Sequence, residues 1–140
     1  MKYTYYDFAQ DSHSLLDKLY KDDKIYNAMC EIAHHACECY LKHLINEYYK
    51  PDQKELLFEK LDVLRLCDLG ILYKYWQSIT ATIINTNITH KLDEINYISY
   101  HTNYPCEGCF FADESHIEIA MQATNLCRAF VNSELERLNS

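Results

Sequence analysis

The amino-acid sequence predicts an all-α fold, an up-and-down antiparallel bundle of four to five helices. The 140-residue chain contains only 2 Gly and 2 Pro, too few to supply the turns of a β-sandwich or barrel. Apolar residues instead recur every three or four positions over long segments, as in amphipathic helices. No internal repeat or linker divides the chain, so residues 1–140 are expected to form a single domain.

The first two predicted helices are the most regular segments. Residues 7–20 place four apolar side chains on one face: Phe8, Leu15, Leu16 and Leu19. Residues 24–49 carry a longer stripe at the same spacing: Met29, Ala33, Ala36, Tyr40, Leu44 and Tyr48. Both segments are therefore expected to pack one face on a common core.

The middle of the chain is predicted as three shorter helices. Pro51 cannot continue a helix but suits the first turn of a new one, so the next helix should cover residues 52–66. Residues 70–100 mix aromatic side chains with a β-branched run at 80–84. A lone strand there would lack a partner for its backbone groups. We therefore predict a helix from residue 70, a break at 85–89, and another helix over 90–100.

The C-terminal part is predicted as a loop over residues 101–111 and a long helix that begins near Ala112. Asp113, Glu114 and Glu118 lie in its first turns, where the helix dipole favours negative charge. An unbroken apolar stripe follows for about six turns: Ile117, Ala120, Met121, Thr124, Cys127, Val131, Leu135 and Leu138.

Charge and composition limit the possible functions. Asp and Glu outnumber Lys and Arg by 21 to 13, which gives a formal charge of -8. Such a chain should repel polyphosphate, so non-specific DNA binding is not expected. We see neither a leader sequence nor an apolar run long enough to span a membrane, and the 7 cysteines are an odd count for a disulfide framework. A cytoplasmic protein with reduced thiols is predicted.

Two sequence segments carry a family resemblance. Residues 33–44 read Ala-His-His-Ala-Cys-Glu-Cys-Tyr-Leu-Lys-His-Leu, and residues 100–105 read Tyr-His-Thr-Asn-Tyr-Pro before the acidic start of the last helix. They are similar to the second-helix pattern and the Tyr-x-x-Arg-Tyr-Pro junction of the HEPN family. Members of that family accompany minimal nucleotidyltransferases or act as ribonuclease toxins. The resemblance implies a bundle that forms a homodimer through its last helices, with a cleft between the subunits.

The same resemblance places the family's catalytic Arg and His at positions where this chain differs. The Arg position is Asn103, and the positions that should offer His are Gly108, Cys109 and Phe110. A neutral amide cannot replace a guanidinium at a phosphate. The leading hypothesis is therefore a non-catalytic binding module, for which the resemblance implies a toxin–antitoxin or nucleotidyltransferase-associated system. Its cleft, expected at Asn103, Tyr104, His101, Glu38 and Lys42, would receive a nucleotide, RNA or a protein partner such as the nucleotidyltransferase.

Two alternatives from other classes stay open. A divergent metal-independent endoribonuclease would use His101 or His116 as base, with Arg128 or Lys42 on the phosphate. A metal or redox protein would use the thiols of Cys106 and Cys109, which form a CxxC motif.

A second set of metal ligands is conceivable on the second predicted helix. His35, Cys39 and His43 lie at four-residue intervals, but the helix offers no fourth ligand, so packing side chains are the favoured interpretation. The sequence contains no GxGxxG, GxxxxGK[ST] or HExxH motif, and no cofactor is expected.

Overall fold

A computed structural model describes residues 2–22, 25–103 and 108–140, with the backbone only at Asn103. Six helices and no strand occur in these residues, so the all-α prediction is confirmed, whereas the helix count exceeds the four or five expected. The helices are α1 (Tyr5–Asp22), α2 (Tyr26–Tyr48), α3 (Lys54–Val63), α4 (Leu69–Thr80), α5 (Thr86–Asn103) and α6 (Glu114–Leu138).

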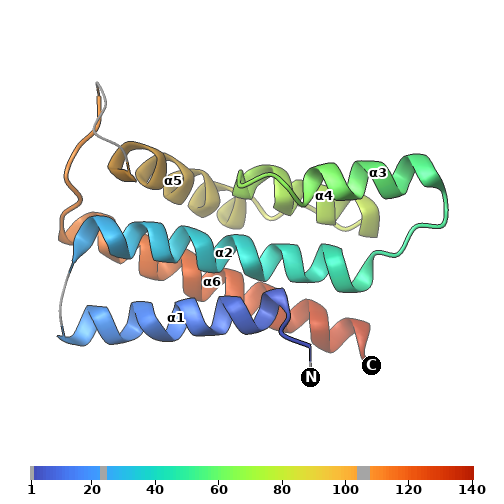
Figure 1. Cartoon of the computed structure of the whole chain (residues 1–140), viewed down its shortest axis with the longest axis horizontal. Helices are drawn as coiled ribbons and strands as arrows, with labels where there is room; N and C mark the ends of the chain where they lie inside the picture. The colour runs from blue at the N-terminus through green and yellow to red at the C-terminus, as the bar shows by residue number, and fades with distance from the viewer. Residues whose placement is uncertain (1, 23–24, 104–107) are drawn as a thin grey trace.

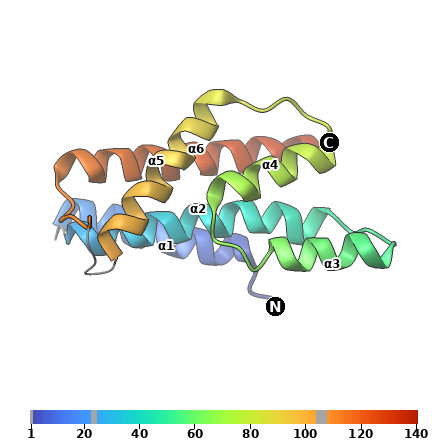
Figure 2. The same cartoon turned by 90° about the horizontal axis from the view of Figure 1, so that it is seen from above.

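Each helix reverses the direction of the one before it, which gives an up-and-down order along the chain (Figure 1). The central helix is α2, which packs against α1, α4, α5 and α6. Seen from above, α6 runs along the length of α2, whereas α5 crosses at an angle (Figure 2). The candidate site lies between α2, α5 and the segment that connects α3 to α4.

The contact between α2 and α6 is made by small side chains. Ala33, Ala36 and Cys37 of α2 are fully buried, and so are Ala120 and Ala123 of α6. The hydroxyl of Thr124 lies 3.9 Å from the sulfur of Cys37 across this contact. Small residues let two helix backbones approach closely, so the long stripes predicted from the sequence meet along their length.

The boundaries of α4 and α5 differ from the predicted ones, in two cases for a local reason. Helix α4 ends at Thr80, because Ala81 adopts a left-handed conformation with φ of 54°. The side chain of Asn85 accepts hydrogen bonds from the amides of Asn87 and Ile88, so the break at 85–89 was placed too late and α5 begins at Thr86. Helix α5 also continues through residues that were predicted as a loop, to Asn103.

Helix α6 begins at Glu114, two residues after the predicted start near Ala112. Asp113 is its N-cap and accepts from the amides of Ser115 and His116, while His116 Nδ1 accepts from the amide of Asp113 at 2.9 Å. This reciprocal capping box satisfies donors that the first helical turn leaves free.

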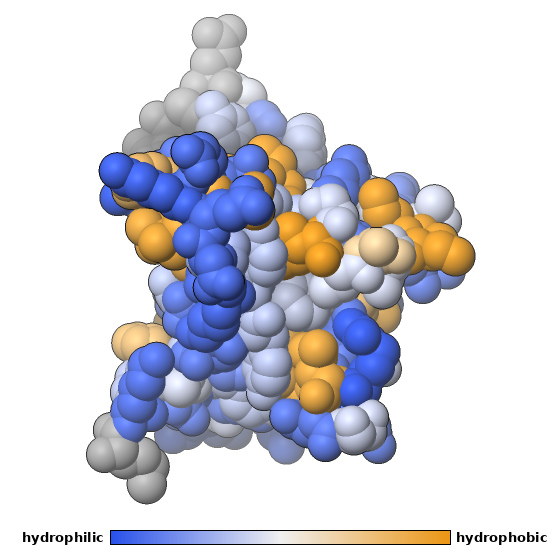
Figure 3. All heavy atoms as spheres, turned by 90° about the vertical axis from the view of Figure 1, so that its right-hand side faces the viewer, coloured by the Kyte–Doolittle hydropathy of each residue, from blue (hydrophilic) through white to orange (hydrophobic). Residues whose placement is uncertain are grey.

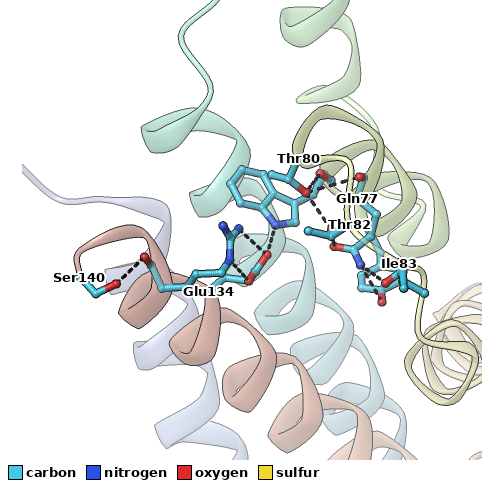
Figure 4. Close-up of polar contacts among 9 residues, drawn as sticks. Gln77, Thr80, Thr82, Ile83, Glu134 and Ser140 are labelled. Carbon is cyan, nitrogen blue, oxygen red and sulfur yellow. Dashed lines mark hydrogen bonds and ion pairs between the residues drawn. The ribbon is translucent and has the colours of Figure 1, made fainter.

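A buried polar contact joins α4 to the C-terminal half of α6. The indole nitrogen of Trp76 donates to Glu134 at 2.8 Å, and Arg137 holds the same carboxylate at 3.0 and 3.2 Å (Figure 4). Glu134 is almost completely buried, yet these donors hold its pKa below the usual value despite the opposing effect of burial. The indole ring and the carboxylate therefore fix α4 against α6.

Helix α3 is an arm rather than a core helix. Of its ten residues, only Lys60 is buried, and its ammonium group donates to the carbonyl of Asn46 in the last turn of α2 at 3.2 Å. Four of its apolar side chains are exposed: Leu56, Leu57, Phe58 and Leu61. Apolar patches stand among hydrophilic residues on the end of the molecule where α3 begins (Figure 3).

Within the described residues, no helix combines the length and apolar character that a transmembrane segment requires.

Candidate ligand-binding cleft between α2 and α5

A cleft of about 540 Å³ opens between α2, α5 and the segment that connects α3 to α4. A volume of this size falls in the range of ligand pockets. Its described lining is mostly polar and aromatic: Glu31, His34, His35, Glu38, Cys67, Asp68, Asn96, Tyr97, Ser99, Tyr100 and His101. The cleft lies within one chain, unlike the inter-subunit cleft that the family resemblance implied.

Helical periodicity explains which residues of α2 line the cleft. Glu31, His34, His35 and Glu38 lie at i, i+3, i+4 and i+7, so they share one face. The opposite face of α2 holds the core residues Met29, Ala33, Ala36 and Tyr40, among others. The cleft is therefore the polar side of the same amphipathic helix that organises the core.

Asn96 of α5 joins the three walls of the cleft. Its side-chain oxygen accepts from His34 Nε2 at 3.0 Å and from the amide of Leu69 at 3.2 Å. Its side-chain nitrogen donates to Asp68 Oδ1 at 3.2 Å. Asp68 in turn caps α4 by accepting from the amide of Ile71. One amide group thus ties α2, α5 and the start of α4 together and assigns the proton of His34 to Nε2.

The charged groups of the cleft are mainly carboxylates. Glu38 accepts from Lys42 at 2.8 Å in a largely buried i, i+4 pair. Glu31 is exposed, and no described residue forms an ion pair with it. Burial holds the pKa of His34 below its usual value, although Asn96, Glu38 and Asp68 act in the opposite direction. His34 is therefore neutral near pH 7, and no described Lys or Arg lines the cleft.

Aromatic rings continue the α5 wall toward α6. Tyr97 and Tyr100 are 59% and 68% exposed and lie 4.3 and 5.1 Å from the ring of His101. Phe110 stacks against the ring of His116 with centroids 4.8 Å apart, and its centroid is 6.1 Å from that of His101. The buried Nδ1 atom of His101 has no hydrogen-bond partner among the described residues.

The structure does not bring the candidate catalytic residues together. Phe110 contacts both His101 and His116, and His116 Nδ1 is engaged in the cap of α6. Arg128 lies twelve residues further along α6, about 18 Å by helical rise, and acts electrostatically on His13 and Tyr40. Lys42 is held by Glu38. A base and a phosphate-binding cation are thus not juxtaposed among these residues.

The predicted binding residues are only partly placed in this cleft. Glu38 and His101 line it, and Lys42 is adjacent through its ion pair with Glu38. Asn103 ends α5, and its side chain is outside the described part of the chain, as is all of Tyr104. Whether Asn103 occupies the family's Arg position stays a prediction.

The candidate metal ligands fall into two groups. His35 Nε2 lies 3.6 Å from the sulfur of Cys39, whereas His43 packs against the rings of Tyr6 and Tyr48. Among the described residues, no three His, Cys, Asp or Glu side chains are grouped so that they could hold a metal ion.

The CxxC hypothesis concerns residues that are only partly described. Cys109 is disulfide-bonded, and Cys106 lies outside the described residues. Metal or redox chemistry at this motif stays a prediction.

Sequence reasoning missed Asp68, Asn96, Tyr97 and Tyr100 as cleft residues. The spacing of Asn96 and Tyr100 at i and i+4 on α5 was a usable signal. Asp68 offered none of this kind, because it approaches the cleft only after the chain turns between α3 and α4.

Comparison of the chain with protein-family models, with curated proteins and with solved structures found no similar protein.

Proposed function

We propose that this chain is a non-catalytic, HEPN-like binding module that receives a partner protein in the cleft between α2 and α5. The observation that carries the proposal is the lining of this cleft, where carboxylates and aromatic rings from three segments meet without a described Lys or Arg. Such a lining disfavours the phosphates of RNA. In line with the family resemblance, the partner would be a nucleotidyltransferase or the other component of a toxin–antitoxin pair.

The candidate catalytic groups are not placed so that they could act together. A general base acts only within hydrogen-bond reach of the proton it removes, and phosphate chemistry needs a cation beside it. His101 has Tyr97, Tyr100 and Phe110 as ring neighbours. Arg128 is several helical turns away from His116, so the two alternatives named for the phosphate, Arg128 and Lys42, do not complete a site.

Purified protein is expected to leave RNA intact, both with Mg²⁺ and with EDTA. The measurement is gel analysis of a broad panel of single-stranded and structured RNAs, with an active ribonuclease as control for the substrates. Cutting that persists in EDTA and is lost in the His101→Ala variant would instead establish the divergent endoribonuclease. The His90→Ala variant, at an exposed histidine outside this cleft, controls for contaminating nuclease.

The proposed module is a homodimer, and α3 offers the apolar surface for a second copy. The family resemblance implied contact through the last helices, but the exposed face of α6 is largely polar, with Glu118, Gln122, Asn125, Asn132 and Glu136. In contrast, α3 exposes Leu57, Phe58 and Leu61 within two turns. Burial of such side chains is the usual driving force for association.

Light scattering coupled to size exclusion is expected to give the mass of a dimer for the wild type and that of a monomer for Phe58→Glu. The matched control is Ile83→Glu, since Ile83 is 92% exposed outside α3. A wild-type protein that stays monomeric at every concentration tested would refute this part of the proposal.

A further inference from the structure

The residues that line the α2–α5 cleft limit the chemical class of ligand that it can bind. Glu31 stands exposed on α2, Asp68 approaches from the α3–α4 connection, and Glu38 lies about two turns further along α2. These three carboxylates come from two separate segments and face one cavity. A cleft with one sign of charge concentrates the opposite sign within it.

The aromatic side chains of α5 that line the cleft also favour a cationic group. Tyr97 and Tyr100 leave more than half of their surface exposed beside these carboxylates. The face of a tyrosine ring carries partial negative charge and attracts an ammonium or guanidinium group. His34 adds no positive charge because its pKa is lowered by burial and its Nε2 proton is donated to Asn96.

The ring of His101 adds a nitrogen atom without a described hydrogen-bond partner. The buried Nδ1 atom of His101, in the same lining, lacks a partner among the described residues. Buried polar atoms of this kind are normally satisfied. In the tautomer that leaves Nδ1 unprotonated, a ligand N–H group would satisfy this nitrogen.

We infer that the cleft recognises an organic cation, the ammonium or guanidinium group of a Lys or Arg side chain or of a free polyamine. This inference rests on the proposal that the cleft is the binding site. It adds the chemical class of the group bound, with Glu31 and Asp68 supplying charge and Tyr100 supplying a ring face. Within the fold, the ammonium group of Lys42 already pairs with the carboxylate of Glu38. A ligand cation would form the same kind of pair with Glu31.

The affinity test uses isothermal titration of the full chain with spermidine, with a peptide rich in Lys and Arg, and with a single-stranded RNA oligonucleotide. Both cationic probes are expected to bind, more weakly as salt increases. Glu31→Gln should weaken binding about two- to fivefold, whereas Glu136→Gln, the same charge change on α6, should not. Tyr100→Ala should weaken it by a similar factor, and Tyr100→Phe, which keeps the ring, by less.

The location test uses Cys67, a free and exposed thiol that lines the cleft. Alkylation with N-ethylmaleimide places a bulky group there and is expected to abolish binding of the cation. The Cys67→Ser protein, treated in the same way, should keep the affinity that it had before treatment. Peptide mapping confirms which thiol has reacted.

The outcomes separate this inference from the proposed function. Binding of the peptide but not of spermidine identifies a partner side chain as the source, and binding of spermidine alone identifies a free polyamine; either supports the inference. Binding of RNA that alkylated Cys67 blocks would overturn the cation inference and keep a binding cleft. If no probe binds, or if alkylation of Cys67 leaves cation binding unchanged, the cation inference is overturned, whereas the proposed function fails separately, if the purified protein cuts RNA.

Discussion

Replacing Trp76 with alanine is expected to lower the free energy of unfolding by about 3–5 kcal/mol. The side chain is 1% exposed, and its removal leaves a cavity between α4 and α6. The substitution also removes the indole N–H group that donates a hydrogen bond to Glu134 at 2.8 Å. Because Trp76 is the only tryptophan, urea unfolding must be followed by circular dichroism rather than by fluorescence.

One further variant separates the packing of Trp76 from its hydrogen bond, and another serves as a control. Trp76→Phe keeps most of the ring volume and removes the N–H donor, so it should cost about 1–3 kcal/mol. Ile83→Ala, at a side chain that is 92% exposed, should change stability by less than about 0.5 kcal/mol. A loss below about 1.5 kcal/mol for Trp76→Ala would contradict the packing of α4 on α6.

Stability is expected to fall steeply as the pH drops below about 6.5. The pKa values of His13, His34 and His43 are all lowered, chiefly by burial. Lowered values mean that the unfolded chain binds protons first, so the stabilisation is complete above the unfolded pKa and declines below it. Each histidine contributes at most about 1.4 kcal/mol per pH unit, and the three together at most about 4.

The surroundings of each histidine explain why protonation is unfavourable. His13 is 1% exposed, contacts Tyr40 and Asn125 through its two nitrogens, and is further disfavoured as a cation by Arg128. His43 lies between the rings of Tyr6 and Tyr48. Glu47 and Asp7 favour its protonated form but do not outweigh burial.

Urea unfolding at a series of pH values between 7 and 5 measures this effect. His43→Phe should flatten the slope, since it removes a titrating group whose buried Nδ1 has no partner in the described part of the chain. His90→Asn, at an exposed histidine, should leave the slope unchanged. The lowered pKa values of Glu47 and Glu134 act only below about pH 4.5, outside this window. A flat profile between pH 7 and 5 would refute the prediction.

The long helices could be predicted from the sequence because their apolar spacing is regular over many turns. The stripe of Met29, Ala33, Ala36 and Tyr40 is fully buried in α2, as expected. The break between α4 and α5 was placed too late, because the conformation of Ala81 and the cap at Asn85 depend on local hydrogen bonds that spacing does not reveal.

The cleft could be predicted only in part, for a related reason. His35, Glu38 and His101 were singled out because each belongs to a recognisable segment. Asp68 and Asn96 are 28 positions apart and meet only because α5 crosses α2 at an angle. Such a crossing is set by packing across the whole bundle rather than by either segment, and residues outside the described ranges leave the Asn103 hypothesis as a prediction.

The contrast between α2 and α3 implies a hierarchy of local opening. Four helices cover α2, whereas α3 buries a single side chain, held by one hydrogen bond to Asn46. Amide hydrogens in the centre of α2 should therefore exchange with solvent deuterium only when the whole domain unfolds, while those of α3 exchange through local detachment at much lower free energy. A protease should accordingly make its first cut near α3 and leave the remaining helices associated.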